Sequence, residues 1–483
     1  MKKLCILLVL ALLLAGCGKA DPGGEQSRMV SFDVYAINDL HGRIVDTAEQ
    51  PGLDELTTYL NLQTGNKLLL STGDMWQGTA ESNLTRGFII TEWMNRVGFT
   101  AMTLGGHEFD WGEALLQENE ELAQFPFLGI NIYNRQTDQR VEYCQSSVMV
   151  EFDGAQVGII GAIGDCYSSI SSEFSQNIYF KTGSELTALV KEEAKKLRRE
   201  GADCIIYTIH DGYDRNTTDT EAMAVSSGAL KGYYDTALSE GYVDLVFEAD
   251  SHYWYNLVDE HGVYHLQAGG NNDGLSHARV LIDKKTGEAT VLTAELIPES
   301  TYKYIKADPL VEELLETYAQ QIAPAQGQLG SNSRYRSGAD ICQLVADLYC
   351  AKGLEKWGAE YDIVLGGGFI SCRSPGYLDA GEVSYSQVLS LLPFDNQITL
   401  CSIRGRDLIS KFLETSNRSY YIKTTAYGES IRHSIDPDGT YYVVTDSYSA
   451  YYTYNHMTVI DTYADNLYAR DLLAELITQG GLC

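Results

Sequence analysis

The chain is poor in positive charge, with 35 Lys and Arg against 66 Asp and Glu, which gives a formal net charge of −31 over 483 residues. A surface this acidic repels polyanions and so excludes duplex DNA and long RNA as partners. It also repels a small phosphate-bearing substrate unless cations in the site reverse the local sign. We therefore expect phosphate chemistry only together with metal ions.

Internal repeats and Cys-x-x-Cys pairs are absent as well. The longest apolar run, residues 4–14, is shorter than the about 20 residues that a membrane-spanning helix needs. Of the ten Cys, eight lie beyond residue 17 without regular spacing, so no disulfide framework is predicted and their pairing stays open. The content of 44% hydrophobic and 21% charged residues predicts a folded protein, and its length predicts at least two domains.

Two lysines precede the N-terminal apolar run, and Leu14-Ala15-Gly16-Cys17 stands at its end. This arrangement resembles the lipobox signal of bacterial lipoproteins. The resemblance implies a signal peptide over residues 1–16, a tether over 17–28 and a lipid on Cys17. The protein would then be anchored to the bacterial cell membrane and face outside the cytoplasm. An ordinary secretion signal, in which Cys17 is incidental, is the alternative.

Strands alternate with amphipathic helices from residue 29 to about residue 300. Short apolar or β-branched runs predict the strands, and apolar residues spaced by three and four over 185–200 predict a helix. This alternation is typical of a layered α/β domain. The strands are expected over 31–37, 67–71, 157–163, 204–209 and 243–247.

The amino-acid composition of the chain changes near residue 330. We expect a first domain over 29–300, a linker over 301–329 with a helix at 309–323, and a second domain over 330–483. The second domain should contain helices over 340–354, 384–392 and 406–413, and strands over 361–365 and 441–445. Three consecutive glycines, Gly366-Gly367-Gly368, predict a tight turn.

Five short segments place Asp or His at the end of an apolar strand. Loops that leave strand C-termini in an α/β layer converge, so segments far apart in sequence can supply one site. Carboxylates and imidazoles together suit divalent ions such as Zn²⁺, Mn²⁺ or Fe²⁺. Taken singly, an Asp or His at such a position is more often a turn residue or a helix cap than a ligand. All five segments in this order are a stronger indication of a site. The segments are 38–42, 73–74, 105–110, 209–212 and 249–252.

In this order the segments resemble the 5′-nucleotidase family of calcineurin-type metallophosphoesterases, whose motifs are D-x-H, G-D, G-N-H-[ED], a lone H and G-H-x-H. The resemblance implies an α/β fold: a four-layer-type β-sandwich flanked by helices, joined by a linking helix to a smaller α/β substrate-binding domain. It also implies two divalent metal ions, of Mn, Zn, Co, Fe or Ca. The residues that match the family's metal ligands are Asp39, His41, Asp74, His210, Asp250 and His252. The residues that match its catalytic pair are His107 and Asp110.

By the same resemblance, Asp39, His41 and His252 would hold the first metal and Asp74 would bridge both. Two positions depart from the family pattern. Gly106 replaces the Asn of G-N-H and offers no side chain, and Asp250 replaces the first His of G-H-x-H. Both changes fall on the second metal, so that site is expected to be weakened.

The second domain resembles the family's substrate domain more loosely. The N-x-G-G-[IV]-R turn appears as residues 365–370 without its Asn and Arg, so Arg373, or Arg334 or Arg336 before the first helix, would have to replace the arginine. Gly367 and Gly368 would belong to this substrate turn. Phe394, in Leu-Pro-Phe, would stack on the base. Tyr454 is the expected second aromatic, with core packing an equal alternative.

These residues predict a metal-dependent phosphoesterase that hydrolyses nucleotides to nucleoside and phosphate. One alternative is a catalytically degenerate relative that binds metal or nucleotide without turnover, as Gly106 and Asp250 suggest. Another is a 2′,3′-cyclic phosphodiesterase or a UDP-sugar hydrolase. The expected partners are a small nucleotide or phosphoester and the membrane, through Cys17; the oligomeric state stays open.

Overall fold

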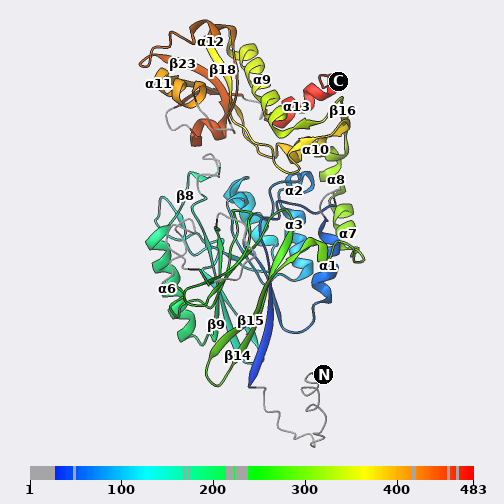
Figure 1. The fold of residues 1–483 in the computed structure, drawn as a ribbon, viewed down its shortest axis with the longest axis vertical. Helices are drawn as coiled ribbons and strands as arrows, with labels where there is room; N and C mark the ends of the chain where they lie inside the picture. The colour runs from blue at the N-terminus through cyan, green and yellow to red at the C-terminus, as the bar shows by residue number, and fades with distance from the viewer. Residues whose placement is uncertain are drawn as a thin grey trace, which may run out of the picture.

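The computed structural model describes residues 28–46, 51–166, 170, 175–213, 222–223, 238–414, 420–453, 457–463 and 467–482. Residues 29–298 carry a six-stranded and a seven-stranded sheet, and residues 328–478 carry a smaller α/β part built on a five-stranded sheet. Helices α7 (Leu310–Thr317) and α8 (Ala319–Ile322) run between the two parts (Figure 1). The predicted mixed α/β fold is confirmed.

The six-stranded sheet has the order β15-β14-β1-β2-β3-β4, in which β1 to β4 are parallel and β14 runs antiparallel to β1. Its inner face buries apolar side chains such as Phe32 and Leu70 against Ile206 and Phe247 of the other sheet, so one core lies between the sheets. The strand bounds are β1 (Met29–Ile37), β2 (Lys67–Ser71), β3 (Ala101–Thr103), β4 (Phe127–Leu128), β14 (Gly274–Asp283) and β15 (Glu288–Pro298).

The seven-stranded sheet has the order β10-β12-β13-β11-β9-β7-β6. Strands β7, β9 and β11 are parallel, so their C-terminal ends lie at one edge. The bounds are β6 (Ser147–Phe152), β7 (Ala155–Ile163), β9 (Cys204–His210), β10 (Ala222–Met223), β11 (Leu245–Phe247), β12 (Trp254–Asp259) and β13 (Tyr264–Ala268).

Helices cover the outer faces of both sheets. The predicted helix at 185–200 is α6 (Gly183–Arg199), which packs Leu186 and Val190 against Ile205 of the seven-stranded sheet. Helices α1 (Leu53–Leu62) and α3 (Phe88–Val97) cover the other sheet (Figure 1). Among the described residues, no helix combines the length and the apolar character that crossing a membrane requires. Cys17, the expected lipidation site, lies outside the described residues.

The C-terminal sheet has the order β22-β18-β23-β21-β24 and is covered by α9 (Gly338–Trp357). The prediction of a tight turn at Gly366–Gly368 is wrong, because all three glycines lie inside β18 (Ile363–Phe369). A Cβ on Gly366 would stand 2.3 Å from the backbone N of Cys350 in α9, and one on Gly367 would stand 2.1 Å from the carbonyl O of Tyr421. The glycines therefore allow α9 and the neighbouring strand to pack closely on β18. The other strands are β21 (Ile398–Arg404), β22 (Tyr420–Thr424), β23 (Thr440–Asp446) and β24 (Thr458–Thr462).

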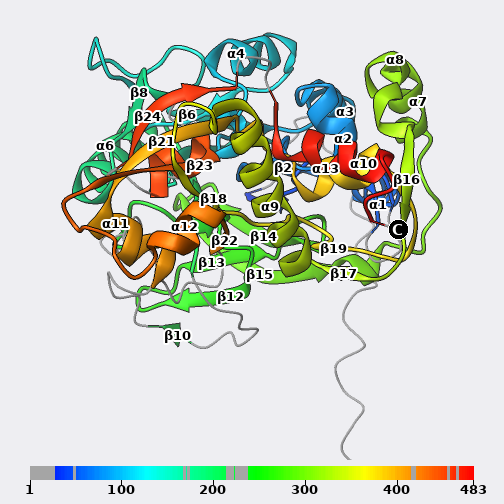
Figure 2. The ribbon, with the colours of Figure 1, turned by 90° about the horizontal axis from the view of Figure 1, so that it is seen from above.

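The C-terminal part lies over the N-terminal part in the view from above (Figure 2), and two of its segments make contacts there. In the first, Ser374 Oγ accepts a hydrogen bond of 2.8 Å from Arg43 Nη2. In the second, Pro393 O accepts one of 2.9 Å from Asn83 Nδ2, and Asp395 pairs with Arg86 at 2.9 Å. These contacts bring the C-terminal part onto the edge where the Asp and His segments converge.

Candidate active site

Five of the predicted metal ligands take a backbone conformation that is rare for residues other than glycine. Their φ angles are positive and lie between 49° and 65°; the residues are Asp39, His41, Asp74, Asp250 and His252. Each such residue costs roughly 1–3 kcal/mol and persists where the surrounding structure enforces it, which occurs most at functional sites. The tight loops turn all five side chains back over the strand ends.

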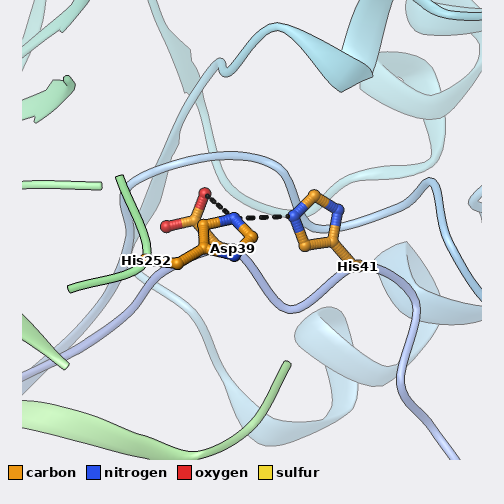
Figure 3. A group of neighbouring side chains, drawn as sticks. All are labelled: Asp39, His41 and His252. Atoms are coloured by element: carbon orange, nitrogen blue, oxygen red, sulfur yellow. Dashed lines mark hydrogen bonds and ion pairs between the residues drawn. The ribbon is translucent and has the colours of Figure 1, made fainter. Parts of the chain in front are cut away.

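The first group comprises Asp39, His41 and His252, whose ligand atoms lie within 4.8 Å of one another. His41 Nδ1 donates to the carbonyl of Gln77 at 3.0 Å, which directs Nε2 toward His252 Nε2, 3.1 Å away (Figure 3). His252 Nε2 also lies 3.4 Å from Asp39 Oδ1. Burial, followed by the neighbouring His252, lowers the pKa of His41 well below its usual value. Two ring nitrogens and a carboxylate facing one point fit a divalent cation.

The second group comprises Asp74, His210 and Asp250, with Asp39 beside them. His210 Nδ1 donates to Thr72 O at 2.8 Å, so Nε2 faces the site, 3.3 Å from Asp74 Oδ2 and 4.0 Å from Asp250 Oδ1. Nε2 of His210 is buried without a hydrogen-bond partner. Burial raises the pKa of Asp74, but His210 and His107 outweigh it and hold that pKa well below its usual value. An orphaned ring nitrogen beside ionised carboxylates fits a second cation.

The two departures from the family pattern leave this second group with fewer donors. Gly106 has ordinary helical dihedrals, φ −66° and ψ −42°, and contributes no ligand atom. The Asp250 carboxylate stands farther from His210 Nε2 than Asp74 does, while its backbone N donates to both Asp39 oxygens at 3.1 Å.

Burial, then the charges of Asp250 and Asp74, raise the pKa of the Cys166 thiol. No motif in the sequence indicated Cys166.

His107 lies between the metal groups and the C-terminal part. Its Nδ1 donates to Asp110 Oδ2 at 2.7 Å, and its Nε2 lies 3.8 Å from Asp74 Oδ2 and 3.3 Å from Arg373 Nη2. Burial opposes the charged ring, but Asp110 and Asp74 raise the pKa of His107 to about 9, against the opposing charge of Arg373. Asp110 thus orients the ring and favours its protonated form.

Glu108 supports this arrangement, although its role was not predicted from the sequence. Its buried carboxylate accepts hydrogen bonds from the backbone N–H groups of Asp74 (2.8 Å), Met75 (2.7 Å) and Gly105 (2.7 Å). The carboxylate thereby joins the loop that carries Asp74 to the loop that carries His107. Its position directly after His107 was a sequence signal, but the contacts are visible only in three dimensions.

A cavity of about 100 Å³ opens between the two parts beside His107. The Phe394 ring centre lies 5.5 Å from that of His107, and the Arg373 guanidinium lies 4.9 Å from the Phe394 ring centre. A second cavity, of about 210 Å³, adjoins His41 and His252. Gln77 and Arg373 line both cavities, so an aromatic compartment and a polar compartment meet at the metal groups.

Not all predicted substrate residues reach these cavities. Phe394 and Arg373 do, whereas Arg336 lies in β17 (Arg336–Ser337), where its Nε donates to Asn332 Oδ1 at 2.9 Å. Gly367 and Gly368 lie inside β18 and do not line either cavity, because their role is backbone packing. Tyr454 lies outside the described residues.

Four aromatic residues that were not predicted from the sequence also line the aromatic cavity: Trp111, Tyr349, Phe369 and Tyr448. Phe369 is the last residue of β18 and Tyr448 follows β23 by two residues, so both stand at strand ends. Their ring centres are 6.1 Å apart. The strand-end rule that found the Asp and His residues would have indicated these two as well.

Carboxylates and imidazoles at the strand ends of a two-sheet sandwich, facing an aromatic cavity, could hold divalent cations and are typical of a metal-dependent hydrolase. Residues 321–458 match the family described as "5′-nucleotidase, C-terminal domain". The chain is 26% identical over 462 residues to the protein UshA of Yersinia enterocolitica, covering 86% of this chain and 81% of that protein. It is also 26% identical over 454 residues to a 5′-nucleotidase of Vibrio vulnificus, covering 82% and 78%.

The fold is similar to a solved structure described as a 5′-nucleotidase from Staphylococcus aureus, with a TM-score of 0.70 and 18% identity. That similarity covers 94% of this chain and 98% of the other and concerns the fold alone. The chain is therefore similar to 5′-nucleotidases over most of its length, and residues 321–458 match that family's C-terminal domain.

Proposed function

We propose that the protein is a metal-dependent phosphoesterase that hydrolyses a nucleotide to nucleoside and phosphate. The observation that carries the proposal is the meeting of the aromatic cavity and the two metal-ligand groups at His107 and Arg373. Relatives named 5′-nucleotidase, which align over about four-fifths of the chain, support the same activity.

The residues that would hold the cations are those of the two groups described above. A first ion would take Asp39, His41 and His252, and a second would take His210 and Asp250, with Asp74 between them. Divalent ions bound there polarise a phosphoryl oxygen and make water a stronger acid. The ions also offset the negative charge of the carboxylates, which would otherwise repel the phosphate.

The side chains that face the phosphate position are cationic or donate hydrogen bonds. Arg373 Nη2 and His107 Nε2 lie 3.3 Å apart and point into one space, so a phosphoryl group there would accept hydrogen bonds from both. His107 then donates its Nε2 proton to the oxygen that leaves with the nucleoside. Asp110 keeps the ring in the required orientation by accepting from Nδ1.

The base would lie between aromatic rings in the adjacent cavity. Phe394 supplies one face, and Phe369 and Tyr448 line the same space. The base would occupy this cavity of about 100 Å³, and the phosphate would face the adjoining polar cavity of about 210 Å³, which shares Gln77 and Arg373 with it.

The test is phosphate release from AMP with Mn²⁺, compared with a 2′,3′-cyclic nucleotide and a UDP-sugar. We expect AMP to be hydrolysed and Asp74→Ala to abolish turnover. Asp138→Ala is the matched control, because Asp138 also has a positive φ of 54° but is exposed and outside the site. No turnover of any of the three substrates by the metal-loaded protein would refute the proposal.

A second candidate function, binding without turnover, is favoured by Gly106 and Asp250. The double variant Gly106→Asn/Asp250→His separates the two. A large gain from a near-zero rate supports a degenerate relative, whereas a wild-type rate that already depends on metal supports the enzyme.

We further propose that lipid on Cys17 anchors the protein to the bacterial cell membrane, facing outside the cytoplasm. The lipobox-like end of the N-terminal apolar run supports this. Cys17→Ala should move the protein from the membrane fraction to the soluble fraction, and an unchanged distribution would contradict the anchor.

A further inference from the structure

Two cysteines of the C-terminal part lie with their sulfur atoms in contact. Cys342 Sγ and Cys372 Sγ are 3.6 Å apart. Cys342 belongs to the second turn of α9 and is 2% exposed, whereas Cys372 lies in the segment 370–376 and is partly exposed. Neither residue belongs to the metal groups or has a role in the proposed hydrolysis, although Cys372 lines the polar cavity beside His41 and His252.

The backbone around the pair explains the contact. Strand β17 pairs antiparallel with β19 (Tyr377–Leu378), which places Ser337 opposite Tyr377. Cys342 and Cys372 each lie five residues farther into the loop that this pairing closes. A Cβ on Gly338 would stand 2.8 Å from the Gly376 carbonyl O and 3.6 Å from Cys372 Cβ. The start of α9 and the segment 370–376 are therefore already packed together.

The sulfur atoms are close enough for a bond after a small local change. A disulfide is about 2.05 Å long, so the two atoms must approach by roughly 1.5 Å. Side-chain rotation supplies movements of this size without displacing the helix. The partial exposure of Cys372 gives an oxidant access to the pair.

The position of this bond matters because the next residue is Arg373. Its backbone N–H donates to Leu391 O at 2.9 Å, and its guanidinium reaches His107 and the Phe394 ring. Ser374, one residue further, accepts from Arg43 of the N-terminal part. A bond at Cys372 would thus fix the backbone on which the phosphate-facing arginine stands.

We propose that Cys342 and Cys372 form a reversible disulfide that ties the Arg373 segment to α9. The oxidant is a small-molecule or protein disulfide, R–S–S–R. The thiolate of one cysteine attacks a sulfur of the oxidant and releases one RSH, and the thiolate of the other then displaces the second RSH and closes the protein disulfide. The two cysteine protons leave on the two released thiols, and the oxidant takes up the two electrons.

The experiment uses the purified full chain and does not depend on its activity. The protein is reduced, freed of reductant, incubated with oxidised glutathione, alkylated and digested with trypsin. Cleavage after Arg336, Lys352, Lys356 and Arg373 yields the peptides 337–352 and 357–373. We expect these peptides to appear linked, and two fewer alkylated thiols per chain than in the reduced protein.

Cys350 lies in the same peptide and the same helix as Cys342, so Cys350→Ala is the matched control. The link should persist in Cys350→Ala and disappear in Cys342→Ala. Closing a loop of about 30 residues should raise the melting temperature of the wild type by roughly 5 to 10 °C on oxidation. Recovery of both peptides unlinked from folded, oxidised wild type, or glutathione retained on Cys372 alone, would overturn the proposal.

Discussion

Replacing Asp110 by Asn keeps the size of the side chain but removes the charge that His107 faces at 2.7 Å. In the wild type, Asp110 and Asp74 overcome the effect of burial and raise the pKa of His107 to about 9. In Asp110→Asn, burial acts against Asp74 alone, so the pKa of His107 should return to its ordinary value near 6.5 or below. The ring is cationic below its pKa, so the variant keeps the proton only at lower pH.

The size of the effect follows from the two protonation equilibria. At pH 7.5 a ring with a pKa of about 9 is almost fully protonated, whereas one with a pKa near 6.5 is protonated to roughly a tenth. We therefore expect kcat/KM for AMP to fall about tenfold or more at pH 7.5, with partial recovery near pH 6. Bound cations lower the pKa of His107 in both proteins, so the direction of the difference is kept.

The assay is a pH profile of kcat/KM for the wild type and Asp110→Asn, with the His107 ring titrated by NMR in the metal-free protein. Glu113→Gln is the control, because this nearby carboxylate contacts Tyr143 and not His107. The alkaline limb of the pH profile of kcat/KM should lie at lower pH for Asp110→Asn than for Glu113→Gln. If the two limbs coincide, Asp110 does not set the protonation of His107 and the assignment fails.

Arg373→Ala should raise KM for AMP by roughly 10- to 100-fold, because a charge-assisted contact to phosphate is lost, while Arg336→Ala should leave KM unchanged. Phe394→Ala should raise KM for AMP by roughly 5- to 100-fold, because stacking on the base is lost, but should change KM for ribose 5-phosphate little. An equal increase in KM for both substrates would contradict a base-stacking role. A third prediction concerns stability: despite burial, Glu248 holds the pKa of His265 at about 9. This raised pKa contributes about 3 kcal/mol to the free energy of unfolding below pH 6.5, and the contribution is lost as pH rises through 9. The free energies of unfolding of wild type and His265→Gln, measured by urea denaturation, should therefore converge toward pH 10.

The metal groups could be predicted because each ligand belongs to a short segment at the end of an apolar strand. Parallel strands bring such ends to one edge of each sheet, and the two sheets pack face to face, so Asp39, Asp74 and His210 meet although they are far apart in sequence. The metal ligands themselves stay predictions until an ion is measured. The structure adds that their loops adopt left-handed backbone conformations, which Asp and His tolerate better than most residues.

The substrate-binding residues were less predictable, because the packing of the C-terminal part on the N-terminal part decides which side chains reach the cavities. The three glycines at 366–368 have the composition of a turn, yet they lie in a strand because α9 and a neighbouring strand approach them closely. The sequence left Arg373, Arg334 and Arg336 as alternatives, and only the fold places Arg373 at His107. The contacts of Glu108 could not be predicted for the same reason, since its three partners come from two separate loops.

The central claim is that Asp39, His41, His252, Asp74 and His210 hold divalent ions that the hydrolysis requires. The most direct measurement is the number of Mn²⁺ ions bound per chain, with phosphate release from AMP recorded on the same samples as metal is restored to metal-free protein. We predict two ions, the second bound roughly tenfold or more weakly because Gly106 and Asp250 supply fewer donors, and a rate that rises with occupancy. Metal-free protein that hydrolyses AMP at the full rate, or Asp74→Ala that binds as many ions as the wild type, would contradict the account.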